Sequence, residues 1–115
     1  GFRDLCKGAK KGNERCALAL EMFAYQTKKY IGAYAAAMGG LDCIVFTAGI
    51  GENSPNVREG VCENLEFLGV KFDKNENNLR VDGIHEISAK DSKVKVLVIP
   101  TNEELVIARE TAALL

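Results

Sequence analysis

The sequence has little of what marks a secreted, membrane-spanning or nucleic-acid-binding protein. Its 15 lysine and arginine residues stand against 16 aspartate and glutamate residues, which leaves a net charge of −1 and no basic field to attract nucleic acid. No apolar run approaches the roughly 20 residues of a membrane-spanning helix, and residues 1–4 do not begin a signal peptide. We therefore expect a cytoplasmic protein that binds neither nucleic acid nor a membrane.

Patterns typical of metal sites and nucleophilic catalysis are also absent. No two cysteines form a C-x-x-C pair, which argues against a zinc site and favours free thiols in a reducing compartment. The only histidine, His85, has no serine or cysteine nucleophile arranged around it, so we predict a surface side chain. The G-x-x-x-x-G-K-[ST] motif of P-loop proteins is missing too, which excludes that way of binding a nucleotide.

The composition that remains is that of an ordinary globular protein. With 47% hydrophobic and 27% charged residues in 115, we expect a single domain spanning residues 1–115. Helical periodicity predicts a first helix from Asn13, as its N-cap, to about Met38, where Gly39 and Gly40 end it. The stripe of this helix that is predicted to pack on a sheet consists of Cys16, Leu20, Phe23, Thr27, Tyr30 or Ile31, Tyr34 and Met38.

The rest of the chain alternates between predicted strands and helices. The predicted elements are strands at 42–46, 70–73 and 93–99 and helices at 55–68 and 101–114. Arg58 is expected to face largely toward water, and the polar residues 74–78 are expected to form an exposed connection. This order indicates an α/β fold with a mainly parallel sheet and packed helices. Both strand-to-helix junctions then fall on one edge of the sheet, where such sheets bind ligands.

The first of these junctions lies in residues 45–54 (VFTAGIGENS). Gly49 and Gly51 allow positive φ and a close approach to the backbone. Ser54 is predicted to cap the following helix, with Pro55 at its first position. Free N–H groups at such a helix start can hold a phosphate or a sugar. A turn that needs glycine only for its geometry is the alternative, since a lone G-x-G pattern is weak.

A dinucleotide site is a second alternative for the same residues. The pattern at 49–54 resembles a dinucleotide fingerprint, and Asp73 follows at about the distance of a ribose-binding acid. Against this interpretation, Ser54 replaces the third glycine, and Glu52 places a negative charge beside the expected pyrophosphate.

The second junction contains two neighbouring glutamates with different predicted roles. If Thr101 is the N-cap of the last helix, Glu104 is at N3 and completes a capping box by accepting from the N–H of Thr101. Glu103 then remains available to hold Mg²⁺, which usually keeps several waters and one or two carboxylates. The alternative is that both glutamates only complement the helix dipole.

Beyond these physical arguments, four stretches resemble the C-terminal part of the acetate kinase family. They are FTAGIGENS at 46–54, VIPTNEE at 98–104, GNER at 12–15 and YIGAY at 30–34. The resemblance covers essentially the whole chain but only a portion of such an enzyme, so we expect a C-terminal fragment. It implies a lobe of the ribonuclease-H-like fold shared by sugar kinases, heat-shock 70 ATPases and actin. The implied reaction transfers the γ-phosphoryl group of ATP to acetate, giving ADP and acetyl phosphate.

The resemblance also implies roles for particular residues. Glu103 would hold Mg²⁺ or Mn²⁺, and Arg3 would be what remains of an Asp-x-Arg element that touches ATP or ADP. The family's catalytic arginines, aspartate and histidines would precede residue 1, so no catalytic residue and no activity are expected of this fragment alone. Ala48 stands where many relatives have glycine. A homodimer through this lobe is implied as well. The adenosine-binding turn would consist of Gly49, Ile50, Gly51, Glu52 and Asn53.

Two other functions remain open from the sequence. A propionate or butyrate kinase would have the same lobe, because nothing in this chain is expected to touch the carboxylic substrate. A non-catalytic binding or interaction module is the alternative from a different class of protein.

Overall fold

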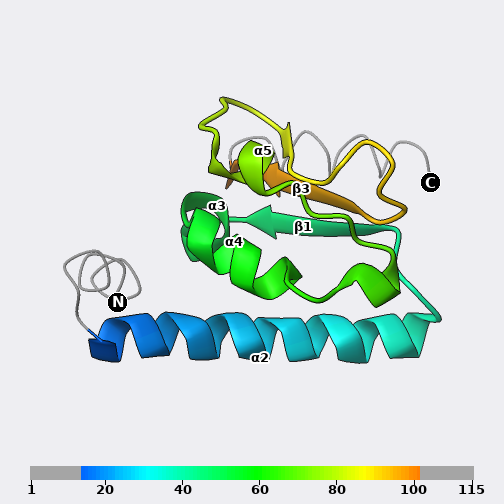
Figure 1. Ribbon diagram of the computed structural model, residues 1–115, viewed down its shortest axis with the longest axis horizontal. Coiled ribbons are helices and arrows are strands. Elements are labelled where there is room, and N and C mark those ends of the chain that lie inside the picture. Colours follow the sequence, from blue (N-terminus) through cyan, green and yellow to red (C-terminus); the bar gives the residue numbers. More distant parts are fainter. Residues whose placement is uncertain (1–13, 102–115) are drawn as a thin grey trace.

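The computed structural model describes residues 14–101 of the chain. Figure 1 shows α2 as a long rod along one side of the molecule, with α4 beside it and the strands beyond. None of the helices in the described range has the length and hydropathy of a membrane span. The predicted cap Asn13 and most of the predicted last helix lie outside that range. The elements are α2 (Glu14–Met38), β1 (Cys43–Thr47), α3 (Gly49–Asn53), α4 (Pro55–Cys62), the 3₁₀ helix η1 (Glu66–Leu68), α5 (Lys74–Asn78), β2 (His85–Glu86) and β3 (Lys95–Ile99).

The strands form one sheet in the order β1-β3-β2. β1 and β3 are parallel and paired from Cys43 with Lys95 to Thr47 with Ile99, whereas β2 pairs antiparallel to β3. The α/β class is therefore confirmed, with a mixed sheet whose longer pairing is parallel. Of the predicted strand at 70–73, only isolated bridges from Val70 and Phe72 are formed.

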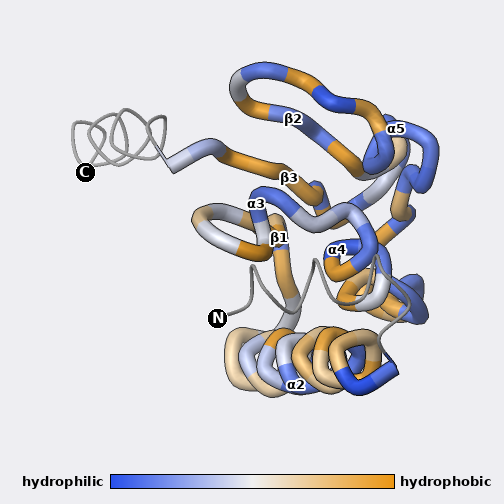
Figure 2. Tube along the Cα trace, turned by 90° about the vertical axis from the view of Figure 1, so that its left-hand side faces the viewer, coloured by the Kyte–Doolittle hydropathy of each residue, from blue (hydrophilic) through white to orange (hydrophobic). Residues whose placement is uncertain are grey.

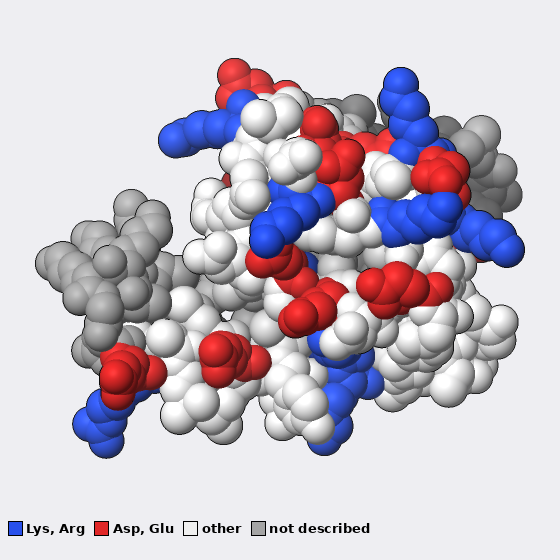
Figure 3. Space-filling model, viewed as in Figure 1, with Lys and Arg blue, Asp and Glu red and all other residues white. Residues whose placement is uncertain are grey.

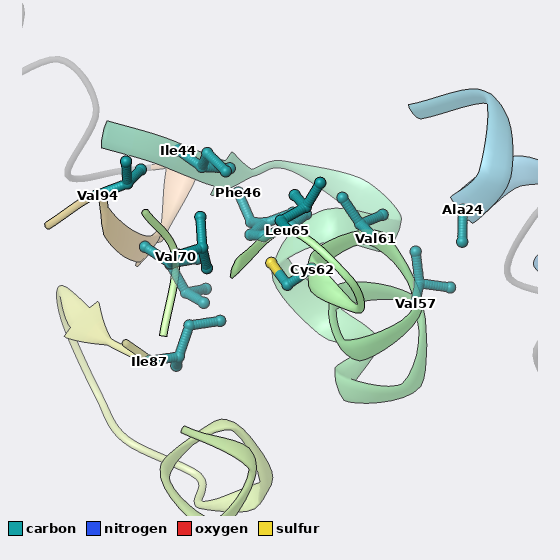
Figure 4. Close-up of a cluster of buried hydrophobic side chains, with 12 residues drawn as sticks. Ala24, Ile44, Phe46, Val57, Val61, Cys62, Leu65, Val70, Ile87 and Val94 are labelled. Atoms are coloured by element: carbon teal, nitrogen blue, oxygen red, sulfur yellow. The ribbon is translucent and has the colours of Figure 1, made fainter. Parts of the chain in front are cut away.

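The hydrophobic core lies between the sheet, α4 and α2. Figure 2 shows β1 and β3 as hydrophobic segments surrounded by more hydrophilic loops, and Figure 4 shows their side chains meeting those of α4. Lys, Arg, Asp and Glu side chains are interspersed on the face seen in Figure 3, as expected for a chain of nearly zero net charge. The buried core consists of Ala24, Ile44, Phe46, Val57, Val61, Cys62, Leu65, Val70, Ile87, Val94, Val96 and Val98.

Helix α2 packs through small side chains together with part of the predicted stripe, since Leu20, Phe23 and Ile31 are partly buried against the core. Ala24 and Ala35 are its buried residues, and a Cβ on Gly60 of α4 would come within 3.2 Å of the Ala24 Cβ. Tyr34 and Met38 were predicted to face the core but are 63% and 65% exposed. The prediction was wrong there because the alanines allow α4 to approach closely, and the helix buries that narrow face.

The predicted helix at 55–68 is divided into two shorter elements. α4 ends at Cys62, and the next helical residues belong to η1. Asn64 between them has φ 64°, a left-handed conformation that asparagine tolerates better than most residues. Gly69 then ends η1 with φ 97°. The apolar period continues through the break, which is why the sequence pattern suggested one helix.

Candidate functional site

The turn after β1 is itself a short helix. Positive φ values occur at Ala48 (56°) and Gly49 (47°), whereas Gly51 lies inside α3 with ordinary helical geometry. Of the two glycines that allow positive φ, Gly49 therefore adopts it and Gly51 does not. Ser54 separates α3 from α4, and its Oγ accepts a hydrogen bond from the N–H of Val57 at 3.3 Å, as an N-cap does.

The side chain of Asn53 makes a hydrogen bond within the turn 49–53. Its Nδ2 donates to the carbonyl oxygen of Gly49 at 2.9 Å, while the residue as a whole stays exposed. Because this bond uses one of the two N–H groups of the amide, Asn53 can still offer a ligand its amide oxygen and its second N–H. The side chain therefore both shapes the turn and presents an acceptor at its surface.

Glu52 joins the two strand-to-helix junctions. Its Oε1 accepts hydrogen bonds from the backbone N–H of Thr101 at 2.9 Å and from the Thr101 hydroxyl at 3.2 Å. The sequence pattern had assigned the Thr101 N–H to Glu104, and Thr101 is itself already helical. Glu103, Glu104 and Arg3 lie outside the described residues. The predicted proximity of the two junctions is confirmed up to Thr101.

The guanidinium of Arg58 is hydrogen-bonded to the turn 49–53. It is only 4% exposed, and its Nη1 donates to the carbonyl oxygens of Gly51 at 3.1 Å and Glu52 at 2.8 Å. Its Nε and Nη2 donate to the side-chain and backbone oxygens of Asn77, at 2.8 Å and 3.2 Å. Burial lowers the pKa of Arg58, partly opposed by the nearby Cys62. The expectation that Arg58 faces water was wrong, because these carbonyl oxygens replace water around the guanidinium.

α5 supplies the other side of this arrangement. Asn77 was expected to be exposed but is fully buried, and its Nδ2 donates to the carbonyl oxygen of Pro55 at 2.9 Å. Asp73 caps α5 by accepting from the N–H of Glu76 at 2.9 Å. The carboxylate of Asp73 thus has a structural partner, which weighs against the dinucleotide interpretation.

A cavity of about 690 Å³ opens beside the turn. Glu52, Asn53 and Arg58 line one side of it, residues 78–83 and His85 line another, and the second junction contributes to the rim. The volume is in the range of small-molecule sites. Its lining brings residues distant in sequence to one edge of the sheet, as expected of an α/β ligand site.

His85 is one lining residue that the sequence placed differently. It was predicted as a surface side chain, but it is only 8% exposed because β2 places it against β3. Its Nε2 lies 2.8 Å from Oε1 of Glu76 in α5. Within residues 14–101, no group of three or more His, Cys, Asp or Glu side chains could hold a metal ion.

Known proteins resemble this chain in sequence and in fold. It is 60% identical over 114 residues to the acetate kinase of Heliobacterium modesticaldum, covering 99% of this chain and 28% of that protein. The acetate kinase of Thermotoga maritima is 61% identical over 111 residues, with 96% and 28% covered. The chain thus spans a little over a quarter of the length of the curated relatives it matches.

Solved structures agree with the sequence comparison. The crystal structure of Porphyromonas gingivalis acetate kinase matches with a TM-score of 0.83 and 48% identity, covering 98% of this chain and 28% of that one. A propionate kinase from Francisella tularensis matches with a TM-score of 0.72 and 37% identity, covering 95% and 27%. A family model described as the Acetokinase family matches residues 1–109, and the chain therefore belongs to that family.

Proposed function

We propose that this chain is the nucleotide-binding portion of a kinase that transfers the γ-phosphoryl group of ATP to acetate. The observation that carries the proposal is the hydrogen-bonded contact between the turn 49–53 and Thr101, beside a cavity at the sheet edge. Membership of the acetokinase family supports the same reaction. Phosphoryl transfer depends mainly on positioning and charge neutralisation, so a rigid nucleotide site is a substantial part of such an enzyme.

In this proposal the turn 49–53 contacts the adenosine of ATP or ADP. Gly49, which lacks a Cβ and has positive φ, allows the ligand to approach the backbone closely. Asn53 offers its amide oxygen to a hydroxyl or amino group of the nucleoside. Arg3 would supply a cation from the segment that precedes α2, and it remains a proposal from the family resemblance.

The metal in the proposal is Mg²⁺ or Mn²⁺, held by Glu103. When bound, such an ion neutralises phosphate charge. A single carboxylate fits this role because Mg²⁺ usually completes its shell with water and substrate phosphates. The donor set within residues 14–101 offers no alternative cluster, so the assignment rests on Glu103.

The acyl substrate and the assembly are finer proposals. Acetate is favoured by the names of the relatives with about 60% identity, and propionate is the second candidate because a propionate kinase shares the fold. We also propose a homodimer, supported by the large apolar side chains that α2 exposes, among them Met22, Tyr30 and Met38. A cytoplasmic location is supported by the free thiols of Cys43 and Cys62.

Calorimetric titration of the full-length protein with ADP, with and without Mg²⁺, tests the nucleotide site. We expect Glu103→Ala to weaken binding of Mg²⁺–ADP by about tenfold and to leave binding of metal-free ADP nearly unchanged. Glu66→Ala, which removes an exposed carboxylate from η1, is the matched control. A wild-type protein that ignores ADP would favour the non-catalytic module instead.

The dinucleotide alternative is tested in the same assay. If NAD binds and Asp73→Ala weakens it, the ribose-binding role of Asp73 holds, and the proposed function fails. We expect no response to NAD, because Asp73 is engaged with the N–H of Glu76.

A further inference from the structure

The carboxylate of Glu52 has a single described partner, and that partner belongs to the other junction. Within residues 14–101, both donors to Glu52 Oε1 come from Thr101, through its backbone N–H and its hydroxyl. The two residues are 49 positions apart in the chain. A carboxylate on the first free N–H of a helix satisfies that donor and complements the positive end of the helix dipole.

The backbone of Glu52 also has a hydrogen-bond partner. Its carbonyl oxygen accepts from Arg58 Nη1 at 2.8 Å, and Arg58 is in turn bound to the fully buried Asn77. The backbone of Glu52 is therefore held by the buried Arg58, and its side chain is held by Thr101. Such a residue has little freedom to move without moving Thr101.

The sheet determines that this contact can form at all. Thr47 at the end of β1 is in register with Ile99 at the end of β3, so both chains leave the sheet at the same level. The five residues of α3 then bring Glu52 to Thr101. Within the described range, the two hydrogen bonds of Glu52 link α3 to Thr101, in addition to the packing of α3 against β3.

We propose that Glu52 is a positioning residue that fixes Thr101, at the second junction, relative to the nucleotide-binding turn. The proposal rests on the function proposed above and deepens it. The family resemblance places Glu52 in the nucleotide-binding turn, and Oε1 of its carboxylate binds Thr101. Glu52 thus contributes to the site by holding the two junctions together while it also lines the cavity.

Hydrogen exchange of the full-length protein, without nucleotide or metal, tests the contact directly. In Glu52→Ala the N–H of Thr101 loses its acceptor, and we expect the peptide containing Thr101 to exchange about tenfold faster than in the wild type. Glu52→Gln keeps an amide oxygen as acceptor and should restore most of the protection. Glu63→Ala, which removes an exposed carboxylate just after α4, should leave that peptide unchanged.

Steady-state kinetics separate positioning from a general loss of folding. Glu52→Ala should raise KM for ATP by about tenfold while KM for acetate changes by less than about twofold, because only the nucleotide side is disturbed. Glu52→Gln should lie close to the wild type. A variant that is merely destabilised would instead lose active enzyme, which lowers apparent kcat and leaves both KM values as they were.

The outcomes distinguish the two proposals. Unchanged exchange and unchanged KM for ATP in Glu52→Ala would overturn the positioning role, and so would a Gln variant no better than the Ala variant. If Glu52→Ala does not fold, Thr101→Val removes the hydroxyl donor and should give a smaller shift in the same direction. If the variants exchange as expected but the wild-type protein forms no acetyl phosphate, the contact between Glu52 and Thr101 is supported. The proposed function is then overturned.

Discussion

Ala48, directly after β1, has a backbone conformation that residues with a Cβ rarely adopt. Its φ of 56° and ψ of 151° lie in a region occupied almost only by glycine. We expect Ala48→Gly to raise the free energy of unfolding by about 1 kcal/mol, because relief of strain exceeds the extra flexibility of glycine in the unfolded chain. Urea denaturation of the full-length protein measures this change.

Ala36→Gly is the matched control for that substitution. Ala36 lies exposed in the interior of α2, where glycine costs about 1 kcal/mol relative to alanine. The two variants should therefore differ in sign. Equal losses of stability would contradict the strained conformation of Ala48.

Ionisation of the Cys62 thiol makes the free energy of unfolding depend on pH in the alkaline range. Burial raises the pKa of its thiol from 9.0 to about 12, against the weaker opposite effects of Lys28 and Arg58. Because the folded pKa is the higher one, this contribution to stability is complete below pH 9 and is lost as the pH rises toward 12. The stability difference between the wild type and Cys62→Ala should be constant below pH 9 and shrink above it.

Denaturation curves of both proteins across that range provide the measurement. Lysines and tyrosines that titrate at similar pH affect the two proteins alike, so the difference isolates Cys62. A difference that stays constant above pH 9 would contradict the raised pKa.

At the scale of elements, Asn77 connects α5 to α4 and, through Arg58, to α3. We expect Asn77→Ala to lower the free energy of unfolding by about 2–3 kcal/mol, since it leaves the buried Nε of Arg58 and the carbonyl oxygen of Pro55 without these partners. Chemical denaturation measures the loss. Asn78→Ala, one residue later and exposed, should change stability by less than about 0.5 kcal/mol. Similar effects in both variants would refute the buried network.

The sequence predicted elements better than it predicted contacts between them. β1 and β3 were recognised because buried parallel strands are continuous apolar runs, and the end of α2 because Gly39 has the positive φ expected after a helix. α4 was predicted too long, since the hydrophobic period does not show where Asn64 turns the backbone.

The candidate site was recovered in part for the same reason. The turn 49–53 and its position next to Thr101 follow from local glycine and capping patterns together with the parallel pairing. Arg58 was missed because its partner Asn77 is 19 residues away, and a charged residue on a helix normally faces water. An arginine seven residues after the last turn glycine, Gly51, within reach of carbonyl groups at the end of a short helix, is the signal that could have indicated it.

At the scale of the whole molecule, this chain is a little over a quarter of the length of the relatives that it matches. We expect the isolated 115-residue chain to form no acetyl phosphate from ATP and acetate, because the family resemblance implies that the acetate pocket and the catalytic side chains would come from other parts of the enzyme. Trapping acetyl phosphate as a hydroxamate provides the measurement, with the full-length protein as the positive control. Turnover by the isolated chain would contradict this assignment.

The position of the aromatic residues on α2 has a practical consequence for spectroscopy. The chain has no tryptophan and three tyrosines, Tyr25, Tyr30 and Tyr34, all more than 60% exposed on this one helix. Tyrosine emission from this part of the protein therefore reports on whatever contacts α2, because the turn 49–53 contains no tyrosine. A protein that binds to α2 would reduce the quenching of this emission by iodide or acrylamide. Binding could therefore be measured without any added label.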